Sequence, residues 1–395
     1  MGKPHIYLDH NATTPLSRAV TLAVAKNEWL FGNASSMHRR GREARAAVEE
    51  ARAQVAGLIN AASEEIVFTA GGSESNNTVL RTLLDPPDGS IFARERTGLV
   101  TSVIEHPCIL KAAEHLEGKG LPVSRVGVDV HGYVNFQELL EMLNSSTGLV
   151  SVMAANNEIG TVQDIAAIAS LAHEAGALFH TDAVQAVGKI PVDVKAMGID
   201  YLSLSGHKIY GPKGVGALYV RKGAPVSPLI HGGHQEHGVR AGTYNTAGII
   251  GLGVAAQEAA EGLRKNSSRE AGLRDRLLKS IRARIPGIRV NGDPKNGLPN
   301  TINISFSGAE GEAILLYLDM EGVEVSTGSA CATGSLEPSY VLIATGLGTE
   351  LAHGSIRFSL GRSTSERDID YVGDVLETII AKIRAMSTLF EGAKI

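Results

Sequence analysis

The sequence predicts an α/β protein: a large, mostly parallel sheet followed by a smaller α+β unit. Short apolar and β-branched runs alternate with helical patterns through the first two thirds of the chain. Such alternation is typical of a sheet whose strands are joined by helical crossovers. Several of these runs are apolar without a break, as in strands that are covered on both faces. The length of 395 residues is enough for two domains.

Seven runs predict the strands of the large sheet. They are Glu65–Thr69, Leu99–Ile104, Val123–Val128, Leu149–Ala154, Ala177–Thr181, Tyr201–Ser205 and Gly216–Val220. The helical patterns around and between them have apolar residues at the helical period. These patterns are Arg39–Ile59, Ser73–Leu84, Cys108–Leu116, Phe136–Leu143 and Asp164–Ala175.

A long pattern rich in Ala and Gly, Thr246–Arg264, predicts a helix that leads to a second unit beginning near Asn266. Strands and helices follow there in mixed order, as in a smaller α+β domain. We expect residues 15–262 to form the large domain, and residues 1–14 and 263–395 the small one. The elements expected in the second unit are helices at Arg269–Arg284, Ala309–Met320, Ser339–Thr345 and Glu366–Met386, and strands at Ile288–Asn291, Asn300–Phe306 and Ser355–Ser359.

Composition and charge exclude several classes of protein. The net charge of −5 makes nucleic acid a poor candidate for a partner. The longest uncharged apolar run, Ala247–Ala256, is shorter than the roughly 18 residues of a membrane span. The first fifteen residues lack the pattern of a signal peptide. Two cysteines are too few for a disulfide scaffold, so we expect a reducing, cytoplasmic location.

Lys208 ends an apolar strand in the segment Ser205-Gly206-His207-Lys208. Most lysines are simply solvated at the surface. This one is flanked by small residues, and desolvation at a strand end can lower the pKa of a lysine enough for imine chemistry with an aldehyde. Ser205 and His207 beside it can both hydrogen-bond a phosphate.

Asp182 closes the preceding strand, in the segment His180-Thr181-Asp182. It is either an exposed carboxylate or the partner of a ring nitrogen. Pyridoxal phosphate needs such a partner, because a carboxylate keeps the pyridine nitrogen protonated and makes the ring an electron sink. Asp182 and Lys208 at neighbouring strand ends fit that arrangement.

Other polar clusters follow the ends of further strands. Gly71, Gly72 and Ser73 lead from a strand into a helix, which is either a glycine turn with a serine N-cap or a phosphate cradle made of backbone N–H groups. His106 and Asn157 each follow a strand as well. Ligands of open α/β sheets gather at the carboxyl edge of the strands, so this clustering indicates one site.

Three histidines, His231, His234 and His237, are spaced by three residues. Helical zinc pairs have a spacing of four, and the glycines here predict a loop, so we expect no metal site. The following loop carries Arg240 and Thr243, which can face an anion.

Cys331 lies in the segment Ser326–Ser335, which consists of small residues and cannot build a core. A cysteine in such a loop is a candidate nucleophile as its thiolate. Cys108, at a predicted helix start, fits a structural role. Arg357, on the strand after the loop, can bind a carboxylate with two hydrogen bonds or form a surface ion pair.

Taken together, the motifs resemble those of the NifS/IscS-type cysteine desulfurases, which are fold-type I pyridoxal-phosphate enzymes. The resemblance covers nearly the whole chain in the same order, and the cysteine segment is similar to that of the first group of the family. The motifs are YLDHNATTP, GGSESNN, EHP, NNEIGTVQ, HTDAVQ, SGHKIYGPKGVGALYVRKG, GVRAGTYN, STGSACATGSLEPSYVL and SIRFSLGR.

The resemblance implies a role for each candidate residue. It makes Lys208 the lysine that holds the cofactor, Asp182 the partner of the ring nitrogen and His106 the ring stacked on it. It makes Cys331 the sulfur acceptor, carried by the small domain. The remaining roles are hydrogen bonds to the ring hydroxyl for Gln185 and Asn157, phosphate binding for Gly72, Ser73, Ser205 and His207, phosphate binding in the neighbouring subunit of a homodimer for Thr243, and substrate carboxylate binding for Arg357 and Asn33.

The implied reaction converts L-cysteine to L-alanine and leaves the sulfur on Cys331 as a persulfide. An iron–sulfur scaffold or another acceptor protein would then receive it. A related aminotransferase or a selenocysteine lyase is the alternative. A metal-dependent hydrolase built on the histidine triplet and a cofactor-free sulfur carrier are further rivals, and the absorption spectrum of the pure protein separates both from a pyridoxal-phosphate enzyme.

Overall fold

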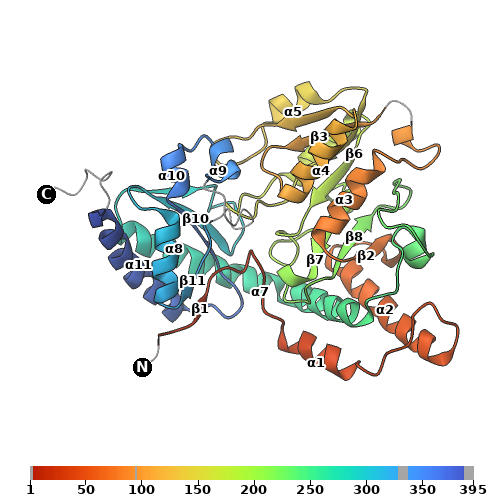
Figure 1. Cartoon of the computed structure of the whole chain (residues 1–395), viewed down its shortest axis with the longest axis horizontal. Helices are drawn as coiled ribbons and strands as arrows, with labels where there is room; N and C mark the ends of the chain where they lie inside the picture. The colour runs from red at the N-terminus through yellow and green to blue at the C-terminus, as the bar shows by residue number, and fades with distance from the viewer. Residues whose placement is uncertain (1–2, 94–95, 328–336, 387–395) are drawn as a thin grey trace.

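The computed structural model describes residues 3–93, 96–327 and 337–386. Figure 1 shows two lobes, and each has its own sheet and its own apolar core. The larger lobe contains the sheet expected from the first two thirds of the chain. The smaller lobe combines both ends of the described chain.

The larger sheet has seven strands in the order β2-β8-β7-β6-β5-β3-β4. Neighbouring strands are parallel, except that β8 runs antiparallel to both β2 and β7. The predicted mostly parallel sheet is therefore confirmed. Its strands are β2 (Ile66–Thr69), β3 (Gly98–Ser102), β4 (Val123–Val126), β5 (Thr147–Ser151), β6 (Leu178–Asp182), β7 (Tyr201–Ser205) and β8 (Gly216–Val220).

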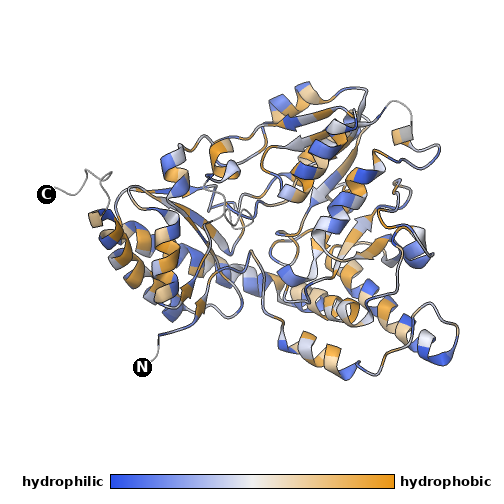
Figure 2. Cartoon of the chain, in the orientation of Figure 1, coloured by the Kyte–Doolittle hydropathy of each residue, from blue (hydrophilic) through white to orange (hydrophobic). Residues whose placement is uncertain are grey.

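Helices cover both faces of this sheet, and most of its strands are therefore buried, with β4 partly exposed. Leu99 and Leu149 belong to the core that includes α3 (Gly72–Thr82) and α4 (Pro107–Gly118). Their neighbours Val100 and Val150 belong to the opposite core, with α2 (Arg39–Leu58), α6 (Ile165–Glu174) and α7 (Thr246–Arg284). This alternation is the two-residue period of a strand. Figure 2 shows the strands rich in hydrophobic residues and the helices with mixed faces.

The strand register brings the predicted site residues to one edge. In the parallel pair of β6 and β7, Asp182 lies opposite Ser203. The turn Gly206–Lys208 that follows β7 therefore stands beside the end of β6. Strands β3 and β5 end at the same edge and lead to the segments that contain His106 and Asn157.

The smaller lobe is built on the antiparallel sheet β12-β10-β9 and the short parallel pair β1-β11. Ile6 and Leu8 near the N-terminus pack in the same core as Leu277 and Phe358. The two cores support the predicted division near residue 262, which stays a prediction; Leu298 is an exception, since it packs in the first core. The elements are β1 (Ile6–Tyr7), β9 (Ile288–Asn291), β10 (Thr301–Phe306), β11 (Val323–Glu324), β12 (Ser355–Ser359), α8 (Gly311–Met320), α9 (Tyr340–Ala344), α10 (Thr349–His353) and α11 (Glu366–Met386).

The expectation of two separate helices, Thr246–Arg264 and Arg269–Arg284, is wrong, because α7 is one continuous helix of 39 residues. Its first half packs in the large core through residues such as Leu252, and its second half packs in the small core through residues such as Leu277. The polar residues around Asn266 lie where the helix passes between the cores, and Ser267 donates a hydrogen bond to the carbonyl of Lys189 at 2.5 Å. The polar residues around Asn266 therefore lie where α7 passes from the large lobe to the small one, and not at the end of a helix (Figure 1).

Several short elements were not predicted. They include α1 (Arg18–Lys26), which Ser17 caps by accepting a hydrogen bond from the N–H of Val20. The pair β1-β11 has two residues per strand, too few to show a period. Within the described part of the chain, no helix is long and apolar enough to cross a membrane.

Candidate active site

A cavity of about 340 Å³ opens at the carboxyl edge of the large sheet. It collects predicted residues from five loops and from the smaller lobe. Those that line it are Gly72, Ser73, His106, Asn157, Asp182, Gln185, Ser205, His207, Lys208 and Arg357. Residues that are far apart in the sequence thus share one cavity, as expected for an open α/β sheet.

Asp182 is buried at the end of β6 and is held by two donors. Its carboxylate accepts hydrogen bonds from Asn76 Nδ2 at 2.7 Å and from the backbone N–H of Val184 at 3.0 Å. Asn76 lies on α3, close to the turn that begins with Gly72. The two donors fix the carboxylate at the cavity wall, where it can face a cationic ring N–H.

Lys208 extends from the short helical turn after β7. Its Nζ donates hydrogen bonds to the carbonyl oxygens of Asn11, at 2.5 Å, and Ala12, at 2.8 Å. Both acceptors belong to the N-terminal segment, which had no predicted role in the site. The amine therefore has a defined position at the cavity.

His106 is the N-cap of α4, and its Nδ1 accepts a hydrogen bond from the backbone N–H of Cys108 at 3.2 Å. Because Nδ1 is an acceptor, the proton of the neutral ring resides on Nε2. Burial lowers the pKa of His106; Asp182 opposes this shift, and Lys208 adds to it. The ring is therefore a neutral, flat surface on the cavity wall, suited to stacking.

Cys108 also lines the cavity, which the sequence did not indicate. Its Sγ lies 3.0 Å from Nδ1 of His106 and 3.2 Å from Nδ2 of Asn76. Burial raises the pKa of this thiol to about 12. It stays protonated at neutral pH and is a poor nucleophile there.

The first turn of α3 forms an anion cradle together with the turn after β7. Gly71 has a φ of 150°, and a Cβ on Gly72 would lie 2.6 Å from Cγ2 of Val184, so the close approach requires glycine. Ser73 and Ser205 line the same region. Free N–H groups at the start of an 11-residue helix attract a phosphate.

His207 adds a neutral ring to this cradle. Its Nδ1 lies 3.1 Å from Oγ1 of Thr13. Burial, assisted by the charges of Lys208 and Lys213, lowers the pKa of His207 to about 4. The ring is uncharged at neutral pH and can donate one hydrogen bond.

Arg357 is a buried residue of β12, not a surface ion-pair residue. Its guanidinium donates to Oδ1 of Asp9 at 2.6 Å and to the carbonyl of Asn157 at 3.1 Å. Its Nε is buried and has no hydrogen-bond partner among the described residues. A carboxylate in the cavity would give this nitrogen an acceptor.

Two predicted site residues do not line this cavity, and a third lies outside the described part of the chain. Asn33 and Thr243 are exposed and do not line it, and Cys331 lies outside the described residues. Among the described residues, no group of three or more His, Cys, Asp or Glu side chains is placed to hold a metal ion.

Several residues of the site were missed in the sequence. Asp9 and Asn11 contact Arg357 and Lys208, and Asn76 holds Asp182. Asn76 had a detectable signal, because it is in the same helix as Ser73 and nearly one turn further on. The contacts of Asp9 with Arg357 and of Asn11 with Lys208 join residues 348 and 197 positions apart and have no local signal.

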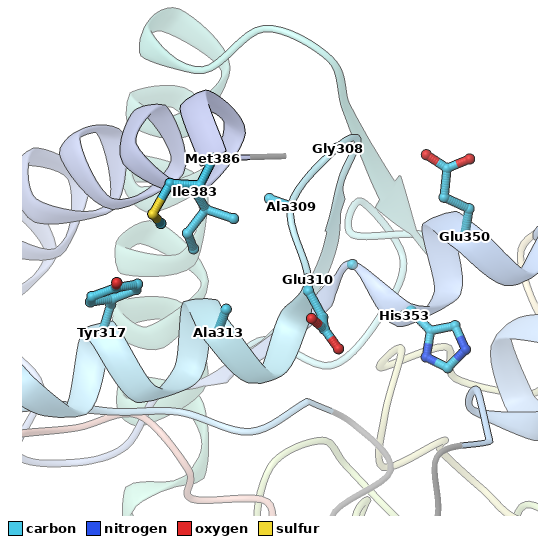
Figure 3. Close-up of a pocket in the computed structure, with 10 residues that line it drawn as sticks. Gly308, Ala309, Glu310, Ala313, Tyr317, Glu350, His353, Ile383 and Met386 are labelled. Carbon is cyan, nitrogen blue, oxygen red and sulfur yellow. The ribbon is translucent and has the colours of Figure 1, made fainter. Parts of the chain in front are cut away.

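A separate cavity of about 570 Å³ lies in the smaller lobe. Figure 3 shows Ile383 and Met386 of α11 facing Ala313 and Tyr317 of α8 across it. None of the predicted site residues lines this cavity. The predicted catalytic and binding side chains that line a cavity are all in the one at the sheet edge.

Comparison with known proteins assigns the chain to a family. The family described as aminotransferase class-V matches residues 6–372. The chain belongs to this family. Class-V aminotransferases bind pyridoxal phosphate, and the cavity fits that cofactor: it offers an amine, a carboxylate, a flat imidazole and the backbone N–H groups at the first turn of α3.

Named relatives of this class-V chain are similar over nearly its whole length. A protein of Dictyoglomus turgidum called cysteine desulfurase IscS is 50% identical over 388 residues, which are 98% of this chain and 97% of the relative. A solved NifS-like protein has 36% identity and a TM-score of 0.89, covering 96% of this chain and 100% of its own. A structure described as SspA in complex with cysteine has 36% identity and a TM-score of 0.79, covering 91% and 100%.

Proposed function

We propose that this class-V chain is a pyridoxal-phosphate-dependent cysteine desulfurase with Cys331 as the sulfur acceptor. The observation that carries the proposal is the backbone pairing of Ser326 with Arg357, at 2.7 and 3.3 Å. The segment with Cys331 therefore starts beside a residue of the cavity. Cys331 follows Ser326 by five residues, and extended chain spans about 3.5 Å per residue, so a thiol there is within reach of the cavity.

The substrate would be bound by its carboxylate and its amine. Arg357 offers the buried Nε and a fixed guanidinium for the carboxylate of L-cysteine. Lys208 would hold the cofactor until the amine of the substrate takes its place. The freed amine of Lys208 would then take the proton from the substrate Cα. Bound pyridoxal phosphate supplies an electron sink for that step. Asp182 would stabilise the protonated ring nitrogen, and His106 would cover one ring face.

Sulfur transfer would use the thiolate of Cys331. It forms a sulfur–sulfur bond with the substrate thiol sulfur, while the bond between that sulfur and the substrate Cβ breaks. The electron pair of the broken bond stays with the carbon, which is later protonated to give L-alanine. The balance is L-cysteine plus a cysteine thiol to L-alanine plus a persulfide, with no external oxidant.

We propose a homodimer as the working form. Thr243 and Asn33 have implied roles in phosphate and substrate binding, yet both are exposed and lie outside the cavity of their own chain. A second copy that brings these residues to the first copy's cavity would account for their positions. A protein acceptor, such as an iron–sulfur scaffold, would take the persulfide, and a reducing cytoplasm would keep Cys331 reduced.

The decisive experiment compares Cys331→Ser with Cys108→Ser after incubation with L-cysteine. In the wild type, mass spectrometry should place one additional sulfur on the peptide that contains Cys331. Cys331→Ser should still bind the cofactor but form no persulfide, and Cys108→Ser should retain the persulfide. Additional sulfur on Cys108, or alanine formed at the full rate by Cys331→Ser, would overturn the proposal.

The same cavity also suits an aminotransferase, which needs Lys208 and Asp182 but not Cys331. That activity would convert an amino acid to its keto acid and would survive in Cys331→Ser. A selenocysteine lyase would instead prefer selenocysteine over cysteine. Measuring keto acid, and comparing kcat/KM for the two substrates, separates these alternatives from the desulfurase.

A further inference from the structure

Lys189 is a buried lysine close to the site that the proposed mechanism does not use. Its Nζ donates hydrogen bonds to Oε1 of Gln185, at 2.6 Å, and Oδ1 of Asn11, at 2.9 Å. Lysine is rarely fully buried, because its head group loses water there. Both of its acceptors line the cavity.

The hydrogen bond to Gln185 determines which end of that amide faces the cavity. Since Oε1 accepts from Lys189, Nε2 is directed the other way and donates to the carbonyl of Asn11 at 3.0 Å. An amide nitrogen has two hydrogens. Because Gln185 lines the cavity, the second hydrogen of Nε2 can serve as a donor there, as a hydrogen bond to the ring hydroxyl of the cofactor requires.

The hydrogen bond to Asn11 supports the other side of the site. Oδ1 of Asn11 also accepts from Nδ2 of Asn300 at 3.1 Å. The backbone carbonyl of the same Asn11 accepts from Nζ of Lys208. A change in the position of Asn11 would thus move an acceptor of the lysine that reacts.

We propose that Lys189 is a positioning residue that orients the Gln185 amide and holds Asn11 for the cofactor site. It acts through these two residues and contacts no cofactor itself. The inference rests on the proposed function, because it concerns the pyridoxal-phosphate site. It adds a residue to the site that no motif pointed to.

The protonation state of Lys189 is compatible with this role. Burial lowers its pKa to about 7; Lys208 and Arg357 also lower it, and Glu270 raises it. Near neutral pH both forms of the amine are present. The neutral amine still has two hydrogens, enough for the two acceptors.

The test measures binding of pyridoxal phosphate to the apo protein by equilibrium dialysis, together with the visible spectrum of the loaded protein. Lys189→Met keeps the chain length but removes the donor. We expect the Kd to rise about tenfold, because a misoriented Gln185 would lose its one hydrogen bond to the cofactor. We also expect the absorption maximum to shift. Ser267→Ala is the matched control: it removes the hydrogen bond to the backbone carbonyl of Lys189 and should leave both readouts unchanged.

A double-mutant cycle with Gln185→Leu distinguishes positioning from general support of the fold. If Lys189 acts through Gln185, Lys189→Met should weaken binding much less in the Gln185→Leu background than in the wild type. Equal effects in the two backgrounds, or an unchanged Kd in folded Lys189→Met, would overturn the inference.

Two further outcomes of the binding experiment are possible. Should Lys189→Met fail to fold, Lys189→Leu takes its place; it also lacks a donor, and wild-type binding by this variant would also overturn the inference. Should the wild type bind no pyridoxal phosphate at all, the proposed function fails and not only the role of Lys189.

Discussion

At the scale of single residues, the charge of Asp182 sets the chemistry of the site. Asp182→Asn keeps the size of the side chain but removes the negative charge that would stabilise a protonated ring nitrogen. We expect alanine formation from L-cysteine to slow by about a hundredfold, the scale of losing one preorganised electrostatic contact. The measurement is kcat at saturating substrate, with circular dichroism to check the fold.

Asn76→Ala is the control for this prediction. It removes the donor at 2.7 Å from the carboxylate but leaves the charge, so a loss of about tenfold or less is expected. Equal losses in Asp182→Asn and Asn76→Ala would show that carboxylate position, and not charge, carries the effect.

The residues at strand ends could be predicted because a strand end is visible in the sequence. Asp182 and Lys208 each follow an apolar run, and the edge of a parallel sheet brings such positions together. Asn11 and Lys189 could not be predicted in the same way. The role of Asn11 depends on hydrogen bonds with residues far away in the sequence, such as Lys208, 197 positions further on. One acceptor of Lys189 is Asn11, 178 positions away, and no local pattern encodes such pairings.

At the scale of elements, the contact between α2 and α7 depends on a small residue. A Cβ on Gly253 of α7 would lie 2.7 Å from the backbone Cα of Ala51 in α2. Gly253→Ala should therefore force the helices apart and lower the free energy of unfolding by about 1–3 kcal/mol. Urea denaturation followed by circular dichroism measures this change.

Gly272→Ala on the same helix is the matched control. Nothing lies within 4 Å of a Cβ at Gly272, so the substitution should raise the free energy of unfolding by about 0.5–1 kcal/mol through helix propensity. If both substitutions stabilise the protein, the packing of α2 against α7 is looser than the structure indicates.

The elements of the large sheet could be predicted because each carries its own period or apolar run. The continuity of α7 could not, since the polar residues near Asn266 have the composition of a linker. What keeps them helical is packing at both ends, with Leu252 in one core and Leu277 in the other. Tertiary contact overrides local composition there.

At the scale of the whole molecule, buried histidines make stability depend on pH. His180 is fully buried between Oγ of Ser151, at 2.8 Å, and Oγ of Ser203, at 3.2 Å. Burial lowers its pKa to about 3, from an ordinary value of 6.5. Between these two values the unfolded chain binds a proton that the folded chain does not, so the stabilisation is complete above pH 6.5 and is lost as the pH falls toward 3.

His180→Gln tests this dependence. The variant lacks the titrating ring, so its deficit in unfolding free energy relative to the wild type should shrink as the pH is lowered from 7 to 4. The expected change is on the order of 1 kcal/mol per pH unit. A deficit that stays constant for His180→Gln would contradict a neutral buried ring.

The N-terminal segment makes completion of the site a late event in synthesis. The backbone N–H of Asn11 donates to Oγ of Ser359 at 3.0 Å, and Ser359 in turn donates through its backbone N–H to the carbonyl of Leu8 at 2.7 Å. A ribosome releases residues 8–11 early but their partner on β12 only near the end of translation. The carbonyls that receive Lys208 therefore lack their anchor in a nascent chain, and loading with cofactor is expected to follow release of the finished polypeptide.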